Sequence, residues 1–155
     1  MGTLINAFEQ YQIPQRVAEP ARVRAILVDG SPEYPAVAMA LLDFHEVVDL
    51  VGRAASTEEA IELAVDLRPD LILVDLDMQF AEFLIAFIAL SPDLSDLKVV
   101  GVAKGHELTA RAAELVVSVS ALISKANLRE EFPRILKVLF NVEAARHRQP
   151  SLSPQ

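Results

Sequence analysis

From Val23 to about residue 140, short apolar runs alternate with longer segments that have the periodicity of amphipathic helices. The apolar runs are residues 23–28, 47–52, 71–75, 98–102 and 119–123, and the helical segments are about residues 32–44, 56–68, 81–90, 106–117 and 127–140. Strands that alternate with helices pair in parallel, because each helix carries the chain back to the same end of the sheet. The pattern predicts an α/β fold, a three-layer α/β/α sandwich with right-handed crossovers around a five-stranded parallel sheet.

Capping and turn residues mark several boundaries. Ser56 and Glu59 have the spacing of a capping box, and Pro69 ends the helix that they begin. Asn127 to Glu130 have the same spacing and are expected to cap the last helix. The helix over residues 81–90 is apolar nearly all round, so we expect it to be well covered. Three phenylalanines are expected to fill the space between it and the sheet: Phe80, Phe83 and Phe87.

The length of 155 residues favours a single domain with a core of its own. The chain has no cysteine, which excludes disulfides and thiolate metal sites. We expect an N-terminal extension over residues 1–22, an α/β domain over residues 23–142 and a flexible tail over residues 143–155. The extension is expected to hold a short helix, since Leu4, Phe8 and Tyr11 share one helical face. No output domain is expected after residue 142, so the domain is expected to act alone.

The charge and hydropathy of the chain exclude several classes of partner. A net charge of -8 disfavours nucleic acid, whose phosphates would be repelled. The longest uncharged apolar run, residues 83–90, is far shorter than the roughly 20 residues that span a bilayer. The N-terminus has no basic segment followed by an apolar run, so we expect a soluble, cytoplasmic protein without a secretory signal.

Three ionisable residues stand just past the ends of three predicted strands. Asp29 follows the first strand, Asp75 the third and Lys125 the fifth. In the flavodoxin-like strand order 2-1-3-4-5, these strands bring the three side chains together where the topology switches direction. Two carboxylates suit a hard divalent cation such as Mg²⁺, and a lysine beside them can hold a phosphoryl oxygen.

The sequence around these positions resembles the receiver domain of two-component response regulators. Residues 27–32 resemble the family's first strand and acidic turn, and residues 68–78 resemble the strand that carries its phosphoacceptor aspartate. Residues 122–126 match its lysine-bearing fifth strand. The resemblance covers about residues 23–142.

This resemblance implies a function for each site residue. Asp75 would accept the phosphoryl group, and Lys125 would grip it. Asp29 and Asp75 would hold Mg²⁺ through carboxylates, and Asp77 through its backbone carbonyl. The side chain of Asp77 would contribute a further carboxylate only if it turns inward instead of into solvent. A histidine kinase or phosphotransfer protein would donate the phosphoryl group to this phosphoprotein, and a downstream protein would read the result.

The sequence also departs from the family pattern. Gly30 stands where a second acid is usual, so Mg²⁺ is expected to bind weakly or not at all, and phosphorylation to be slow. Ala103 replaces the hydroxyl residue that ends the fourth strand, and Leu122 replaces the aromatic switch of the fifth. Gln79 and Phe83 stand where the family usually has a proline and a glycine after the phosphoacceptor aspartate. Coupling of phosphorylation to a surface change is therefore expected to be weak or absent.

Other interpretations stay open at this point. The leading alternative is a pseudo-receiver that binds a protein partner without phosphorylation, through the fourth helix, fifth strand and fifth helix. The turn Asp29-Gly30 also faintly resembles cobalamin-binding domains of this architecture, but Ser31 stands where they need a histidine. The turn after the first strand lacks the run of hydroxyl and glycine residues that would wrap a flavin phosphate, which disfavours a flavin-binding flavodoxin. Lys104 is either a further phosphoryl contact or a solvated lysine. An apolar stripe is either core or the face of a homodimer: Val116, Val117, Val119 and Leu122.

Overall fold

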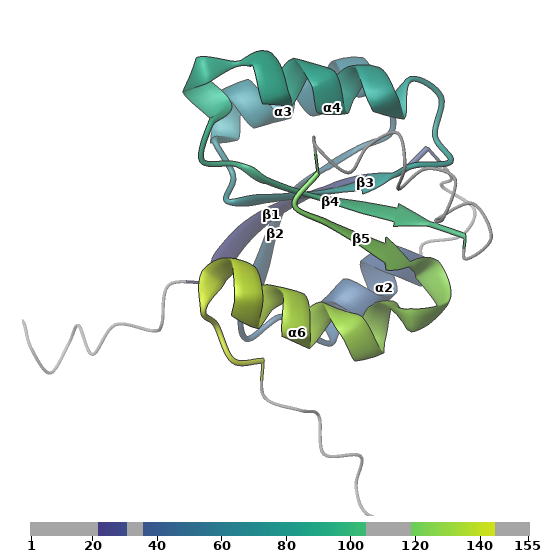
Figure 1. The fold of residues 1–155 in the computed structure, drawn as a ribbon, viewed down its shortest axis with the longest axis vertical. Coiled ribbons are helices and arrows are strands. Elements are labelled where there is room, and N and C mark those ends of the chain that lie inside the picture. The colour runs from purple at the N-terminus through teal and green to yellow at the C-terminus, as the bar shows by residue number, and fades with distance from the viewer. Residues whose placement is uncertain (1–21, 31–35, 105–118, 145–155) are drawn as a thin grey trace, which may run out of the picture.

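The structure, a computed structural model, describes residues 22–30, 36–104 and 119–144. Within them one parallel sheet has the strand order β2-β1-β3-β4-β5 (Figure 1). The strands are β1 (Val23–Val28), β2 (Val48–Ala54), β3 (Leu71–Asp75), β4 (Lys98–Ala103) and β5 (Ala121–Ser124). The predicted flavodoxin-like order is confirmed.

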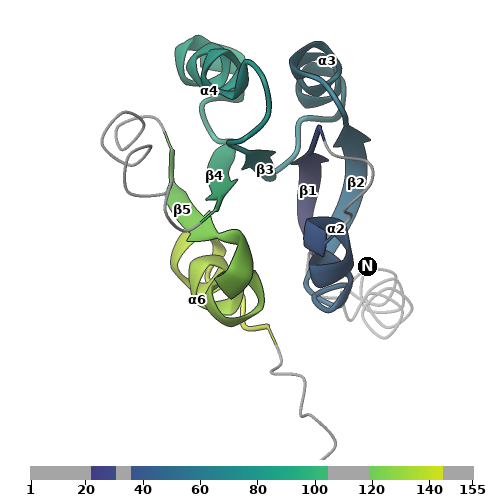
Figure 2. The ribbon, with the colours of Figure 1, turned by 90° about the vertical axis from the view of Figure 1, so that its right-hand side faces the viewer.

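Helices cover both faces of the sheet. On one face lie α3 (Thr57–Leu67) and α4 (Ala81–Leu90), and on the other lie α2 (Ala36–Leu42) and α6 (Leu128–Phe140) (Figures 1 and 2). Two single-turn helices, η1 (Pro92–Leu94) and η2 (Lys125–Asn127), precede β4 and α6. The predicted three-layer sandwich is therefore confirmed.

The sheet divides the apolar core into two clusters, because successive strand side chains point to opposite faces. In β1, Ala25 and Leu27 pack on the α2 and α6 side, whereas Ile26 and Val28 pack on the α3 and α4 side. All five residues of the central strand β3 are buried. β3 pairs with β1 on one side and β4 on the other, and its last residue, Asp75, pairs with Val102 of β4.

Two predicted helix caps have different outcomes. At α3, the Ser56 hydroxyl accepts a hydrogen bond from the backbone N–H of Glu59, as predicted. The Glu59 carboxylate in turn accepts one from the backbone N–H of Ala55, at 2.8 Å. At α6 the predicted cap is wrong, because the side chain of Asn127 makes no cap hydrogen bond. Asn127 ends η2 with φ -107° and ψ 10°, so its backbone is not in the extended conformation that side-chain capping needs.

The prediction that α4 is well covered is also wrong in part. Its sheet-facing stripe consists of Ala81, Leu84, Ile85 and Ile88, which are all buried. This stripe already occupies the side of the helix toward the core. Phe80 and Phe83 therefore remain 64% and 62% exposed instead of filling the space above the sheet.

Several boundaries differ slightly from those predicted, and some expectations lie outside the described residues. The fifth strand begins at Ala121, two residues later than expected, and Val119 and Leu122 pack against the core. The N-terminal helix, the helix over residues 106–117 and the end of the tail fall in the ranges that the structure does not describe. In the described part of the chain, no helix has both the length and the apolar character needed to cross a membrane.

Candidate functional site

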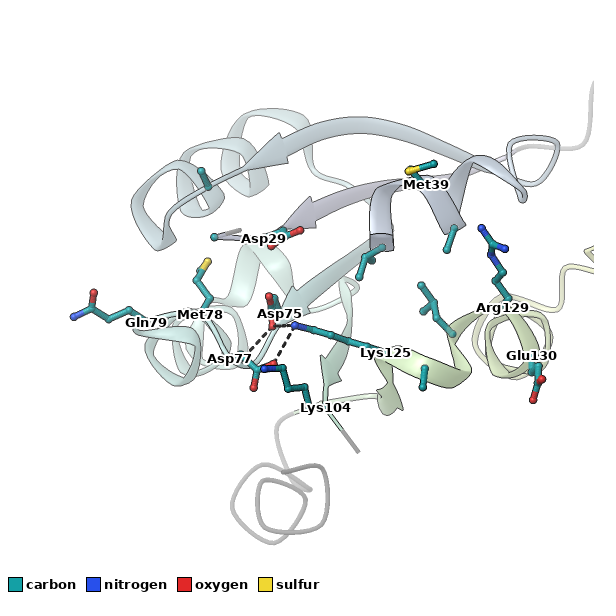
Figure 3. Close-up of a pocket in the computed structure, with 16 residues that line it drawn as sticks. Asp29, Met39, Asp75, Asp77, Met78, Gln79, Lys104, Lys125, Arg129 and Glu130 are labelled. Carbon is teal, nitrogen blue, oxygen red and sulfur yellow. Dashed lines mark hydrogen bonds and ion pairs between the residues drawn. The ribbon is translucent and has the colours of Figure 1, made fainter. Parts of the chain in front are cut away.

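The carboxyl ends of β1, β3 and β5 bring the three predicted site residues to one cavity. Asp29 directly follows β1, Asp75 is the last residue of β3, and Lys125 directly follows β5. All three line a cavity of about 1160 Å³ (Figure 3). The parallel pairing of the strands explains this convergence, because their carboxyl ends lie at the same edge of the sheet.

Asp75 is nearly buried, and its two carboxylate oxygens have different surroundings. The Nζ of Lys125 lies 3.0 Å from Oδ1. The backbone N–H of Asp77 donates a hydrogen bond to the same oxygen, also at 3.0 Å. No hydrogen bond or ion pair from a described residue reaches Oδ2. Oδ1 is thus held in place by two donors from within the protein.

Lys125 bridges two carboxylates. Its Nζ lies 3.0 Å from Asp77 Oδ2 as well as 3.0 Å from Asp75 Oδ1 (Figure 3). Burial by itself lowers the pKa of Lys125, but the hydrogen bonds and negative charges of Asp77 and Asp75 outweigh it, so the pKa is raised. Lys125 is therefore a fixed positive charge at neutral pH, and the side chain of Asp77 turns toward the site instead of away from it.

Asp29 has a cationic neighbour that the sequence analysis missed. Its side chain is 4% exposed, and Oδ2 lies 3.7 Å from Nη2 of Arg53 in β2. The pair could have been inferred from the strand order, because β2 lies next to β1. In the register of these two strands, Arg53 is the partner of Leu27, two residues before Asp29. Asp29 thus faces a guanidinium group within the protein itself.

Gly30, at the position of the usual second acid, lies against a methionine. A Cβ atom at Gly30 would come 3.0 Å from Cγ of Met78, which lines the same cavity. The Met78 side chain is flexible and would have to shift by a few tenths of an ångström to admit a larger residue. Compared with a site that has an acid at this position, the site of this chain carries one negative charge less.

The arrangement does not fit a tight magnesium site. Such sites depend on the number of carboxylates that face the ion. Here Lys125 lies at ion-pair distance from Asp75 and Asp77, and Arg53 from Asp29. Among the residues that the structure describes, no group of three or more acids or histidines is placed to hold a metal.

The remaining polar side chains around the cavity belong to its rim. Lys104 lines the same cavity as Asp77 and Lys125 (Figure 3). Arg129 also lines it, but its Nε makes an ion pair of 3.2 Å with Asp43, which follows α2. The site is therefore a carboxylate held by a lysine, within a cavity that is also lined by the cations Lys104 and Arg129 and the acid Glu130.

Solved structures of response-regulator domains are similar to this chain. No family model matches the chain. The response regulator domain of Thermotoga maritima CheB is 23% identical, with a TM-score of 0.59 over 79% of this chain and 99% of that one. A putative response regulator from Chloroflexus aurantiacus is 18% identical, with a TM-score of 0.68 over 79% of this chain and all of the other. The chain has the fold of a response-regulator receiver domain.

Curated relatives are similar in sequence to this chain over shorter segments. The transcriptional regulatory protein LiaR of Bacillus subtilis is 33% identical over 81 residues, which are 50% of this chain and 37% of LiaR. A protein-glutamate methylesterase/protein-glutamine glutaminase of Alkalilimnicola ehrlichii is 39% identical over 57 residues, 37% of this chain and 15% of the enzyme. The chain thus spans well under half the length of these relatives.

Proposed function

We propose that this receiver-fold domain accepts a phosphoryl group on Asp75 in two-component signal transduction. The observation that carries the proposal is the contact set of Asp75 at the end of β3. Lys125 and the Asp77 backbone N–H both hold Oδ1, and Oδ2 faces no hydrogen-bond donor among the described residues. A carboxylate oxygen that can act as the nucleophile therefore lies beside a cation that can balance the charge of a transferred group.

The proposed reaction is a displacement at phosphorus. Asp75 Oδ2 attacks the phosphorus of a phosphohistidine, a new O–P bond forms, and the P–N bond breaks with its electron pair returning to the imidazole. The product is an acyl phosphate on Asp75 and a free histidine on the donor. Lys125 stays within reach of the transferred group and balances part of its negative charge. No metal takes part in this description, since the described residues do not fit a tight metal site.

The phosphoryl donor proposed here is a histidine kinase or a phosphotransfer protein, and a downstream protein is the proposed reader. Receiver domains in general interact with such proteins. Ala103 is fully buried at the end of β4 and offers no hydroxyl group to the cavity. With Leu122 in place of an aromatic switch as well, we expect phosphorylation to change the surface only weakly.

A second candidate function is a phosphorylation-independent interaction module. One observation favours it: the three aspartates Asp29, Asp75 and Asp77 each already have a cation of the protein within 4 Å. A site whose charges are balanced internally gains less from a metal ion or a phosphoryl group than one that lacks a counter-charge.

Beryllofluoride, which mimics an aspartyl phosphate, separates the two functions. The experiment records amide NMR spectra with beryllofluoride and Mg²⁺ in excess. Phosphoacceptor function predicts shifts of the amides around Asp75 and Lys125, and their loss in Asp75→Asn. Unchanged spectra at millimolar Mg²⁺ would support the interaction module and contradict the phosphoacceptor function.

A further inference from the structure

Helix α4 carries a second apolar stripe in addition to the one that packs on the sheet. Phe83, Phe87 and Leu90 are spaced by four and three residues, which places them along one side of the helix, and Phe80 stands directly before the helix as its N-cap residue. Phe80, Phe83 and Leu90 are 64%, 62% and 83% exposed, and Phe87 is half-buried against the core. We call these four residues the outer stripe. Large apolar side chains exposed in one row mark a surface that another element covers.

The backbone of Phe80 supports the view that the outer stripe serves binding. Phe80 has φ 65° and ψ 21°, in the left-handed region that favours glycine. Its side chain is mostly exposed and contributes little to the core. Fold stability alone would therefore favour glycine at this position.

The surroundings of the outer stripe are acidic. Residues 54–97, which include α3, β3, α4 and the turn to β4, hold ten of the chain's 22 acidic residues but only one of its 14 basic residues, Arg68. Two of the ten, Asp75 and Asp77, lie in the cavity with Lys125 and do not belong to this surface. Helix α3, which lies beside α4 on the same face of the sheet (Figure 2), exposes four of these acids. They are Glu58, Glu59, Glu62 and Asp66. An occupant of this surface must tolerate or neutralise that charge.

We propose that the outer stripe of α4 docks a basic amphipathic helix of a partner protein. An apolar row with three- and four-residue spacing fits the apolar face of a second helix, and lysines or arginines beside that face complement the acids of α3. A second copy of this chain carries a net charge of -8 and would be repelled, as would an anionic membrane. The proposal does not depend on phosphorylation of Asp75.

Other segments of this chain fit the surface poorly. Residues 1–21 and residues 105–118 each contain two glutamates and one arginine, so neither supplies the required positive charge. Residues 145–155 contain two arginines, but Leu152 is their only large apolar residue. Charge and apolar content together therefore point to a partner protein.

The test uses a pair of synthetic amphipathic peptides of about 20 residues, long enough to form a helix. Both carry leucines at three- and four-residue spacing, and one has lysines where its twin has glutamates. The full chain is titrated with each fluorescently labelled peptide, and Kd is read from anisotropy. We expect the lysine peptide to bind at least about tenfold more tightly than its twin, and its affinity to fall as salt is raised. Equal affinity of the two peptides would overturn the proposal.

Variants locate the binding surface. Phe80→Gly relieves the left-handed backbone and Phe83→Ala keeps a good helix former, so the double variant should fold. We expect it to weaken binding of the lysine peptide by at least about tenfold. The control variants Leu42→Ala and Val138→Ala remove side chains that are 63% and 76% exposed on the opposite face, and should change Kd less than about twofold.

Two outcomes would contradict the assignment of the surface. One is equal weakening by the control variants, which would indicate non-specific attraction of a basic peptide to an acidic protein. The other is a dimer of the chain in analytical ultracentrifugation that the Phe80→Gly and Phe83→Ala changes abolish, which would assign the surface to a second copy. Asp75→Asn should bind the lysine peptide with unchanged affinity, which separates this proposal from phosphoacceptor function.

Discussion

Replacing Lys125 with methionine removes the charge that Asp75 and Asp77 share while keeping an unbranched side chain of similar length. Two ion pairs of 3.0 Å are lost. The Asp75 side chain is 7% exposed and that of Lys125 is 31% exposed, so the pair lies between the exposed and the fully buried case. Exposed pairs contribute about 0–1 kcal/mol, and removal of one partner from a buried pair costs about 3–5 kcal/mol. We expect Lys125→Met to lower the free energy of unfolding by about 1–3 kcal/mol.

Urea denaturation followed by circular dichroism at neutral pH, with a chelator present, measures this difference. Lys137→Met is a matched control. Lys137 also makes an ion pair, 3.2 Å from Glu143 Oε1, but the two side chains are 51% and 82% exposed. This control should change the free energy of unfolding by less than about 0.5 kcal/mol.

The test compares the loss in free energy of unfolding between Lys125→Met and Lys137→Met. A loss in Lys125→Met no greater than that in Lys137→Met would refute the argument that the buried carboxylate needs its lysine. A further consequence concerns Mg²⁺, which should raise the stability of Lys125→Met more than that of the unchanged protein. The reason is that the variant leaves two neighbouring carboxylates without their shared cation.

Three further predictions concern pH, packing and metal affinity. The raised pKa of Lys125 means that its stabilising effect is fully present below the ordinary value of 10.5 and is lost as pH rises through the higher folded-state pKa. The deficit of Lys125→Met in urea titrations should therefore shrink only above about pH 10.5, and a deficit that disappears near neutral pH would contradict this. Gly101→Ala should lower the free energy of unfolding by about 1–3 kcal/mol, because its Cβ would meet two leucine side chains at 2.8 and 2.9 Å. Gly52→Ala, with contacts of 3.3 Å or more, should cost less, and the reverse order in thermal denaturation would be inconsistent with the packing. Gly30→Asp adds a carboxylate once Met78 shifts, so Mn²⁺ affinity measured by magnetic resonance should rise about tenfold, whereas unchanged affinity would show that charge count does not limit the site.

The arrangement of the site follows from the sequence because strand ends are easy to recognise. The run from Leu71 to Val74 is apolar, short and preceded by Pro69, so a buried strand that ends at Asp75 was predictable. Parallel topology then fixes Asp29 and Lys125 at the same edge. These predictions need only periodicity and chain order.

Features that depend on three-dimensional neighbours were not predictable in the same way. The pair between Arg53 and Asp29 requires the register of β2 on β1, which periodicity does not give. Phe83 on α4 was expected in the core because its helix is apolar on more than one side, and sequence alone does not show which side faces the sheet. Asn127 fails as a cap because a single-turn helix precedes it.

The central claim is that Asp75 accepts a phosphoryl group, and intact-protein mass spectrometry after incubation with acetyl phosphate or phosphoramidate tests it most directly. The account predicts a slow gain of one phosphoryl group that is lost in Asp75→Asn and slowed in Lys125→Met. No gain at millimolar Mg²⁺, or a gain that persists in Asp75→Asn, would contradict it.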